Sequence, residues 1–265
     1  MNIIVLQPTY FAGTTPDAAI AEFLMEQLNN IPEGSLVVFP EYSNAGGLSD
    51  PEQELKALPR AKEMLKKAQQ AAQEQKIYVA INVLEERDGN LRNSTYLYDK
   101  NGNIAFVYDK IHLPPSELSL NVKPGDGSCV CEVDGIRYGF MTCYDIYYNE
   151  QIEFLAKNKP DIIIFPVYQR GERTDIIRAQ AKLTAFRCNA YVARSSYSMN
   201  SEDRGGCAMI VSPDGTILED LGNNTGKIGT EIDPKWKYMR SAGFGGGMIR
   251  NDDFIGNGLM PEVFQ

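Results

Sequence analysis

The 265-residue sequence predicts one α/β domain in which two mixed β-sheets pack face to face and helices cover the outside. Short apolar segments alternate with amphipathic helical segments, which is typical of α/β proteins. Hairpin signals interrupt this alternation, so the sheets should contain antiparallel as well as parallel strands. The two halves repeat the same order of elements, and no linker separates them. We therefore expect a single domain over residues 1–265.

In the first half, apolar residues recur with helical spacing between residues 18 and 28. Ser35 to Phe39 is a short apolar run that ends at Pro40-Glu41, as a buried strand would. Lys100 to Asn103 is a hairpin signal between two strand segments. We expect strands at residues 2–7, 35–39, 77–84, 94–99 and 104–108, helices at 17–29 and 59–75, a turn at 86–90 and a loop at 110–127.

The second half follows the same order. Asp134-Gly135 and Pro213 to Gly215 are turn signals that indicate two further hairpins. We expect strands at residues 128–133, 136–141, 162–165, 191–196, 208–212, 216–220 and 227–232, and helices at 151–157 and 174–187. From about residue 241 the chain is rich in glycine, which predicts an irregular C-terminal tail.

Charge and hydropathy argue against several classes of function. The net charge of −9 does not suit a surface for nucleic acid or an anionic membrane, because such surfaces need clustered Lys and Arg. No apolar run approaches the roughly 20 residues of a membrane-spanning helix. The apolar residues 1–6 predict a first strand and not a signal peptide, because a basic segment and a cleavage site are missing.

The cysteines indicate a reducing environment. Their number is odd and their spacing irregular, which does not suit a disulfide framework. They are Cys129, Cys131, Cys143, Cys188 and Cys207. We therefore expect a cytoplasmic protein. No CxxC pair occurs and His112 is the single histidine, so we expect no metal site and no cofactor.

Three chemically active side chains follow predicted strands. Cys143 follows the apolar run that ends at Met141, Glu41 follows Phe39-Pro40, and Lys110 follows the strand at 104–108. Chemistry in α/β proteins usually lies at the carboxyl ends of strands. Taken singly, each residue has a plainer explanation, namely a buried structural thiol, a loop acid and a surface charge.

Together the three residues are sufficient for hydrolysis without histidine. A free thiol is mostly protonated at neutral pH, so Cys143 needs a base. A carboxylate at Glu41 would accept the thiol proton as the substrate is attacked. The ammonium of Lys110 would stabilise the thiolate and then the oxyanion, and the backbone N–H of Tyr144 would be a second oxyanion donor. Such a set can attack an amide carbonyl or a nitrile carbon.

These motifs, in this order, are similar to those of the nitrilase superfamily of carbon–nitrogen hydrolases. The resemblance covers nearly the whole chain. It includes Phe39-Pro40-Glu41, Asn93, Asp99 to Gly102, Lys110-Ile111-His112-Leu113, Pro124-Gly125, Cys143-Tyr144-Asp145 with Glu150, and Ser212 to Gly215. The resemblance implies an αββα sandwich, a catalytic triad of Glu41, Lys110 and Cys143, and homo-oligomers in which two sandwiches stack.

A second glutamate follows from the same resemblance. Family members often carry one in the loop between the lysine and the Pro-Gly pair, and Glu117 matches it. Its implied role is to position the substrate and the lysine, or to assist the hydrolytic water. A surface loop acid is the alternative. The chain departs from the family at Arg187-Cys188, where relatives commonly carry a Glu-Asn pair, which puts helix packing in question more than chemistry.

The residues around the nucleophile favour an amide as substrate. Cys143-Tyr144-Asp145 resembles the amidase and carbamoylase branches, whereas nitrilases more often carry Cys-Trp-Glu. Hydrolases of N-carbamoyl amino acids tend to place arginines directly after the cysteine, where this chain has Ile146-Tyr147-Tyr148. Arg170 and Arg173 remain candidates for a carboxylate clamp or for solvated loop charges. Aromatic residues near strand ends suggest the pocket lining, although packing alone also explains them; they are Tyr42, Tyr144, Tyr147 and Tyr168.

Three other interpretations stay open at this point. Cys143 and His112 would make a Cys–His hydrolase, although such sites generally need a third group to orient the imidazole. A binding protein that retains the sandwich without activity is a second class, against which the intact triad argues. The run from Gly243 to Gly247 lacks the context of a phosphate-binding loop. We expect that run to pack against a partner subunit.

Overall fold

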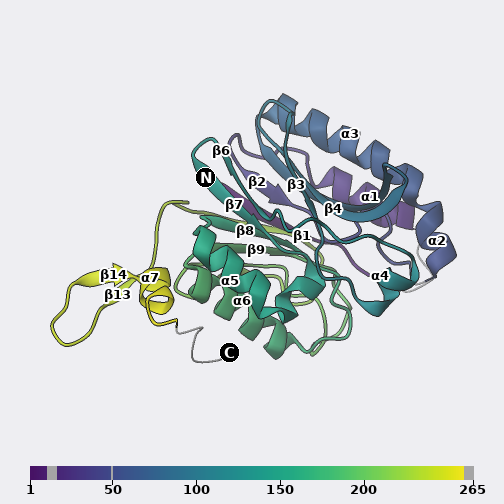
Figure 1. Ribbon diagram of the computed structural model, residues 1–265. Coiled ribbons are helices and arrows are strands. Elements are labelled where there is room, and N and C mark those ends of the chain that lie inside the picture. The colour runs from purple at the N-terminus through teal and green to yellow at the C-terminus, as the bar shows by residue number, and fades with distance from the viewer. Residues whose placement is uncertain (11–16, 49, 260–265) are drawn as a thin grey trace.

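The computed structural model describes residues 1–10, 17–48 and 50–259, and its architecture is the predicted α/β sandwich (Figure 1). Two six-stranded mixed sheets lie against each other, and helices cover their outer faces. Among the helices that the structure describes, none has the length and apolar character needed to cross a membrane.

The first sheet has the strand order β12-β1-β2-β3-β4-β5. Its three neighbours β1, β2 and β3 run parallel, and the other pairs run antiparallel. The strands are β1 (Asn2–Gln7), β2 (Leu36–Val38), β3 (Tyr78–Arg87), β4 (Asn90–Tyr98), β5 (Ile104–Asp109) and β12 (Gly226–Glu231).

The second sheet repeats this design with the order β11-β10-β9-β8-β7-β6. Here β7, β8 and β9 run parallel, and the flanking pairs are antiparallel. The strands are β6 (Val130–Val133), β7 (Ile136–Phe140), β8 (Ile162–Pro166), β9 (Tyr191–Ser195), β10 (Met209–Val211) and β11 (Ile217–Asp220).

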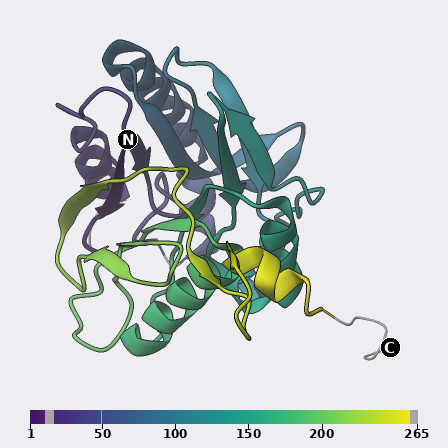
Figure 2. The ribbon, with the colours of Figure 1, turned by 90° about the vertical axis from the view of Figure 1, so that its left-hand side faces the viewer.

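Helices cover the outer face of each sheet. α1 (Asp17–Glu26) and α3 (Leu58–Gln75) lie on the first sheet, and α5 (Asn149–Asn158) and α6 (Thr174–Cys188) lie on the second (Figures 1 and 2). The shorter helices are α2 (Pro51–Lys56), α4 (Pro115–Ser119), α7 (Asn251–Gly256) and the 3₁₀ turn η1 (Cys143–Tyr147).

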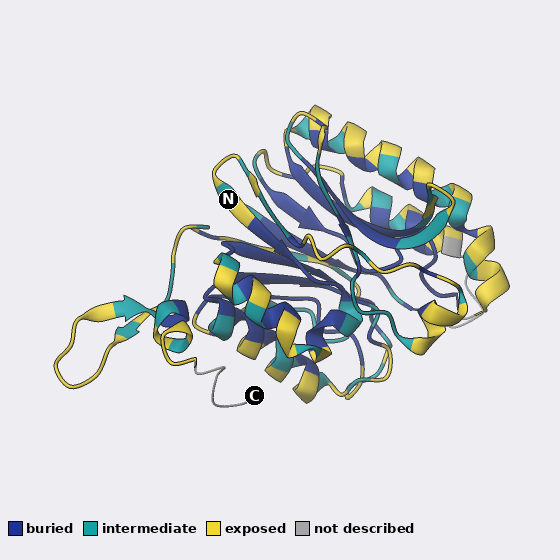
Figure 3. Ribbon diagram, in the orientation of Figure 1, coloured by how far each residue is buried: buried dark blue, intermediate teal, exposed yellow. Residues whose placement is uncertain are grey.

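The alternation of side chains along β1 explains how one strand serves two layers. Ile3 and Val5 pack into the core between the sheets, whereas Ile4 and Leu6 pack under α1 and α3. Successive side chains of a strand point to opposite faces, so a strand covered on both sides must be apolar throughout. Figure 3 shows this as continuous burial of the central strands in both sheets.

The loops differ from the sequence prediction in two places that matter for the site. The loop expected at 110–127 contains α4, and α2 precedes the helix expected at 59–75. Both are about one and a half turns long, too short for hydrophobic periodicity to reveal them.

The turn expected at 86–90 is shorter than predicted. β3 continues to Arg87 and β4 begins at Asn90, so only Asp88-Gly89 make the hairpin turn.

The glycine-rich segment from about residue 241 contains regular elements that the sequence analysis did not predict. β13 (Met239–Ser241) and β14 (Met248–Arg250) form a hairpin that projects from the sandwich, and α7 follows it beside α5 and α6 (Figure 1). Gly243 and Gly245 adopt positive φ in the connecting turn, which glycine allows without steric cost. Three-residue strands carry no detectable alternation. Residues 260–265 of the predicted tail lie outside the described residues.

Candidate active site

Glu41, Lys110 and Cys143 converge from both sheets at one end of the sandwich. Glu41 lies three residues beyond β2, Lys110 directly follows β5, and Cys143 lies three residues beyond β7. All three line one cavity of about 170 Å³. Its walls comprise Glu41, Tyr42, Pro51, Glu54, Lys110, Pro114, Ser116, Glu117, Ser119, Leu120, Cys143, Tyr168 and Arg170.

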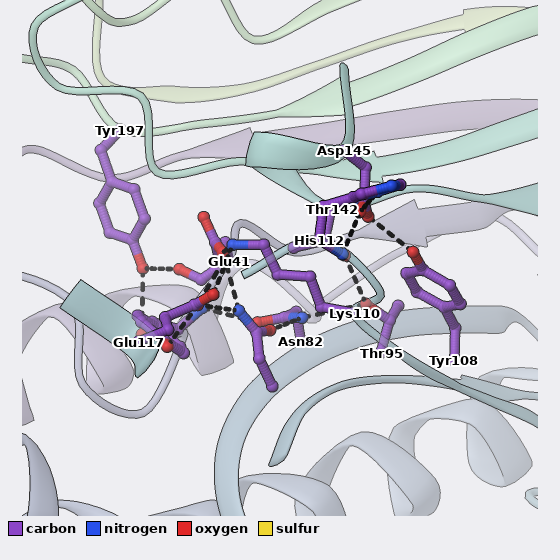
Figure 4. A network of polar contacts seen from close by, with 12 residues as sticks. Glu41, Asn82, Thr95, Tyr108, Lys110, His112, Glu117, Thr142, Asp145 and Tyr197 are labelled. Atoms are coloured by element: carbon purple, nitrogen blue, oxygen red, sulfur yellow. Dashed lines mark hydrogen bonds and ion pairs between the residues drawn. The ribbon is translucent and has the colours of Figure 1, made fainter. Parts of the chain in front are cut away.

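The ammonium of Lys110 lies between two buried carboxylates (Figure 4). Its Nζ donates to Glu41 Oε1 at 2.8 Å and to Glu117 Oε1 at 3.1 Å. Glu117 Oε2 lies 3.0 Å from the same Nζ but accepts no hydrogen bond of good geometry from a described residue. The three side chains are 2–3% exposed, so their charges interact with little screening by solvent.

Asn93 on β4 holds the two carboxylates in place, and Asn82 on the neighbouring strand β3 orients it. Asn93 Nδ2 donates to Oε1 of Glu41 at 2.8 Å and to Oε1 of Glu117 at 2.7 Å. Asn82 Nδ2 in turn donates to Asn93 Oδ1, which orients the amide. Tyr42 OH also donates to Glu117 Oε1, at 2.6 Å. The sequence comparison pointed to Asn93 only as a family feature, and its contacts explain what it does.

Backbone contacts fix the position of Lys110. Its N–H donates to Asn93 O, and Gly125 N–H donates to the Lys110 carbonyl. A Cβ atom on Gly125 would lie 2.2 Å from Asp109 O, so only glycine allows this approach of the loop to the strand end. Burial alone would lower the pKa of Lys110, but the charges of Glu41, Glu117 and Cys143 outweigh it and raise this pKa above its usual value.

The backbone around Cys143 is strained and anchored. Cys143 has φ +44°, in the left-handed region that side chains rarely adopt. It opens the 3₁₀ turn η1, which Asp145 ties down (Figure 4). Oδ2 of Asp145 accepts from Thr142 N–H at 2.7 Å and from Tyr108 OH at 2.6 Å. Strain held by such contacts is typical of functional residues.

The surroundings of Cys143 disfavour its thiolate form. Burial and the negative charge of Glu41 raise the pKa of the thiol well above its usual value, and the charge of Lys110 opposes them only in part. The backbone of Tyr168 donates a hydrogen bond that also favours the thiolate. Attack by this thiol would require a base, and Glu41 is a neighbouring carboxylate whose charge acts on it.

The outer part of the cavity holds a second, smaller set of charges. Glu54 lies on α2 and is partly exposed, and Arg170 lies after β8 and is exposed, whereas Glu41, Lys110 and Glu117 are buried. The Arg170 guanidinium lies over the Tyr168 ring, 4.9 Å from the ring centroid. It donates a hydrogen bond to Tyr10 OH at 3.0 Å, which orients the guanidinium. Glu54 was missed by sequence analysis. An Asp50-Pro51 helix start is the signal that would have placed α2 there.

Two predicted pocket residues do not line the cavity. Tyr147 is exposed, and its hydroxyl donates to Glu172 at 2.7 Å, so its assignment to the pocket is corrected. The Tyr144 ring packs against the rings of Tyr147 and Tyr148. Tyr144 is the second residue of η1, where the backbone N–H has no partner within the turn. The N–H thus remains available, whereas the side chain serves packing.

His112 is held away from the cavity wall. Its ring stacks on Tyr148 with centroids 3.9 Å apart, and Nδ1 lies 2.9 Å from Asp145 Oδ1. It is not among the residues that line the cavity around Cys143. The Cys–His interpretation therefore has no supporting contact. Within the described ranges, no group of three or more His, Cys, Asp and Glu side chains is arranged to hold a metal ion.

Comparison with known proteins identifies the class to which this fold and site belong. Residues 18–239 match the carbon–nitrogen hydrolase family, so the chain belongs to that family, in the amidase-like branch of the nitrilase superfamily. It is a hydrolase of carbon–nitrogen bonds other than peptide bonds.

Individual relatives are amidases. An (R)-stereoselective amidase from Pseudomonas sp. is 30% identical over 208 residues, which cover 75% of this chain and 73% of the relative. A 2-oxoglutaramate amidase from Bacillus subtilis is 26% identical over 160 residues, which cover 58% and 61% of the two chains. The structure of an amidase from Nesterenkonia sp. matches with a TM-score of 0.75 at 16% identity, over 100% of this chain and 95% of that one. This last likeness shows the fold.

Proposed function

We propose that the protein hydrolyses a small amide through a thioester on Cys143, releasing ammonia or an amine. The observation that carries the proposal is the convergence of Cys143, Glu41, Lys110 and Glu117 on one cavity. The names of the relatives, which include a formamidase and an omega-amidase, support an amide over a nitrile or an N-carbamoyl compound. The cavity volume of about 170 Å³ suits a small substrate.

In the first half of the reaction, the thiol attacks the amide carbonyl carbon. Glu41 accepts the proton from Sγ as the S–C bond forms, because the buried thiol does not ionise by itself. The carbonyl oxygen becomes an oxyanion, which the Lys110 ammonium and the Tyr144 N–H stabilise. When the C–N bond breaks, protonated Glu41 returns its proton to the leaving nitrogen, and the acyl group remains on Cys143 as a thioester.

In the second half, water resolves the thioester. Glu41 accepts a proton from the attacking water, and the same two donors stabilise the new oxyanion. When the C–S bond breaks, protonated Glu41 returns its proton to the sulfur, which restores the Cys143 thiol. Glu117 positions the substrate, since its Oε2 has acceptor capacity that no described residue uses. In the free enzyme, its carboxylate and that of Glu41 raise the pKa of Lys110, which favours the ammonium form.

A substrate panel and labelling of Cys143 test the proposal. Ammonia release should occur with small amides more readily than with ureido acids or nitriles, and Cys143→Ala should abolish it. An electrophilic substrate should leave a mass adduct on Cys143. Cys131→Ala is the matched control, because Cys131 lies on β6 and outside the cavity wall. An adduct on Cys188 or Cys207 with Cys143 unmodified would contradict the assignment.

We further propose that the protein is a cytoplasmic homo-oligomer. The outer helix layer carries three large apolar side chains that are exposed, namely Phe154 on α5 and Ile176 and Leu183 on α6. Phe244 is fully exposed at the tip of the projecting β13–β14 hairpin. Exposed apolar groups of this kind are typical of protein contact surfaces. Light scattering at micromolar concentration should show a dimer or larger species, and a monomer alone would contradict the proposal.

A further inference from the structure

One carboxylate in the cavity has no role in the proposed reaction. Glu54 lines the cavity from α2, and its carboxylate has no hydrogen bond or ion pair within the described residues, although the charge of Arg170 acts on it. We propose that Glu54 binds a protonated amine on the acyl chain of the substrate, so that the enzyme prefers amides that carry a cationic group. This inference rests on the proposed function and specifies its substrate class.

The other acidic residues at the start of α2 already have partners. Asp50 caps the helix by accepting from the N–H groups of Glu52 and Gln53, and Glu52 pairs with Lys56 at 2.7 Å. Glu54 is the acidic residue of this helix that lines the cavity. A partly buried carboxylate without a partner is costly. A cationic ligand group would supply the missing partner.

The charges of the cavity wall favour a cationic ligand over an anionic one. Glu41, Glu54 and Glu117 contribute negative charge, and Lys110 and Arg170 contribute positive charge. With all five ionised, the wall therefore carries one net negative charge. Glu41 and Glu117 already pair with Lys110, so Glu54 is the carboxylate of the wall that can take a ligand cation as its ion-pair partner.

The aromatic part of the wall also suits a protonated amine. The hydroxyl groups of both tyrosines are used elsewhere, because Tyr42 OH donates to Glu117 and Tyr168 OH donates to Leu48 O. Tyr42 and Tyr168 line the cavity, and the Tyr168 ring already lies beneath the Arg170 guanidinium, which shows that this part of the wall accommodates a cation. Ammonium groups are attracted to aromatic faces, and a nearby carboxylate adds to that attraction.

Arg170 is the opposing feature. Its charge would repel an ammonium group and attract a carboxylate, so an anionic amide has to be tested beside the cationic one. The guanidinium is held over Tyr168 and bonded to Tyr10 OH, and among the described residues no ion pair joins it to Glu54. Its charge nevertheless lowers the pKa of Glu54, so a ligand ammonium would share this carboxylate with Arg170.

Three amides of similar length distinguish these possibilities. Butyramide is neutral, 4-aminobutyramide is cationic and succinamate is anionic at pH 8. The wild-type enzyme should show the highest kcat/KM with 4-aminobutyramide. In Glu54→Gln the ratio of kcat/KM for 4-aminobutyramide to that for butyramide should fall roughly ten- to hundredfold, the range for a hydrogen bond to a charged group.

Glu52→Gln is the matched control, because it makes the same change on the same helix outside the cavity. It should leave the ratio unchanged. A wild-type preference for succinamate, or an unchanged ratio in Glu54→Gln, would overturn the assignment while hydrolysis of butyramide still supports the amidase function. If none of the three amides is hydrolysed, the amidase function itself is wrong.

Binding to Cys143→Ala tests the assignment without turnover. Calorimetry should show that 4-aminobutyramide binds this variant more tightly than butyramide does, and that adding Glu54→Gln removes the difference. Equal affinity for the two amides in Cys143→Ala would overturn the role of Glu54 whether or not the enzyme hydrolyses them.

Discussion

Three glutamates line the same cavity, but their surroundings differ. Glu41 and Glu117 form the cavity floor, where each is nearly fully buried and accepts hydrogen bonds from Lys110 and Asn93. Glu54 lies on the cavity rim, is partly exposed and has no such contact with the described residues. The floor is thus a connected hydrogen-bond network, whereas the Glu54 carboxylate on the rim is influenced mainly by burial and by the charge of Arg170.

This difference shows how environment assigns separate tasks to one residue type. Burial raises the pKa of Glu117, and the Lys110 charge counteracts it. Burial also raises the pKa of Glu54, to about 7, although Arg170 opposes it. Floor carboxylates are suited to proton transfer and positioning at the reacting atoms. The rim carboxylate is suited to recognition, and its charge changes near neutral pH.

The largest expected effect comes from removing the cation of the floor. Lys110→Ala should lower kcat by roughly 10²–10³-fold or more, because it removes stabilisation of the oxyanion. Lys110→Arg should restore turnover only in part, since a planar guanidinium does not replace a compact ammonium between two carboxylates. Steady-state ammonia release with butyramide measures both variants.

Folding has to be checked in the same experiment, because Lys110→Ala leaves Glu41 and Glu117 buried without their partner. Circular dichroism would report a loss of structure. Lys66→Ala, on the exposed face of α3, is the control and should keep normal turnover. Near-normal turnover of a folded Lys110→Ala protein would remove Lys110 from the mechanism and with it the functional distinction between floor and rim.

The floor could be predicted from sequence because its residues follow recognisable strands. Glu41, Lys110 and Cys143 each come within three residues of a strand end, and strand ends at one edge of a sandwich meet in space. Glu117 could be predicted only through family resemblance. That Asn93 bridges both carboxylates could not be inferred, because the contact joins residues 52 and 24 positions apart.

The rim could not be predicted because its elements are short. α2 spans six residues and α4 spans five, so neither shows a hydrophobic period. Nothing in the sequence distinguishes Glu54 from the neighbouring acidic residues, and only the fold shows that it lines the cavity. The assignment of Tyr147 to the pocket is wrong for a related reason. The direction of its side chain depends on the 3₁₀ turn η1, whose geometry the sequence does not reveal.

A smaller expected effect is a pH dependence of substrate preference, which should distinguish Glu54 on the rim from the carboxylates of the floor. Since the pKa of Glu54 is raised to about 7, the group is mostly neutral at pH 6 and mostly ionised at pH 8. The preference for 4-aminobutyramide over butyramide should therefore rise with pH, by roughly tenfold between pH 6 and pH 8 if it follows the ionised fraction. The amine of the substrate stays protonated over this range, by analogy with lysine.

Taking the ratio of the two substrates isolates Glu54 from its charged neighbours. Glu41, Glu117, Asp50 and Arg170 all act on its carboxylate, and the pKa of Glu117 is itself raised. Titration of the floor changes the hydrolysis of both amides alike, because both present the same amide group to Cys143, and so it cancels in the ratio. In Glu54→Gln the ratio should be independent of pH. A pH-dependent ratio that persists in Glu54→Gln would assign the titration to the floor, and the two sets of carboxylates would then no longer have separate tasks.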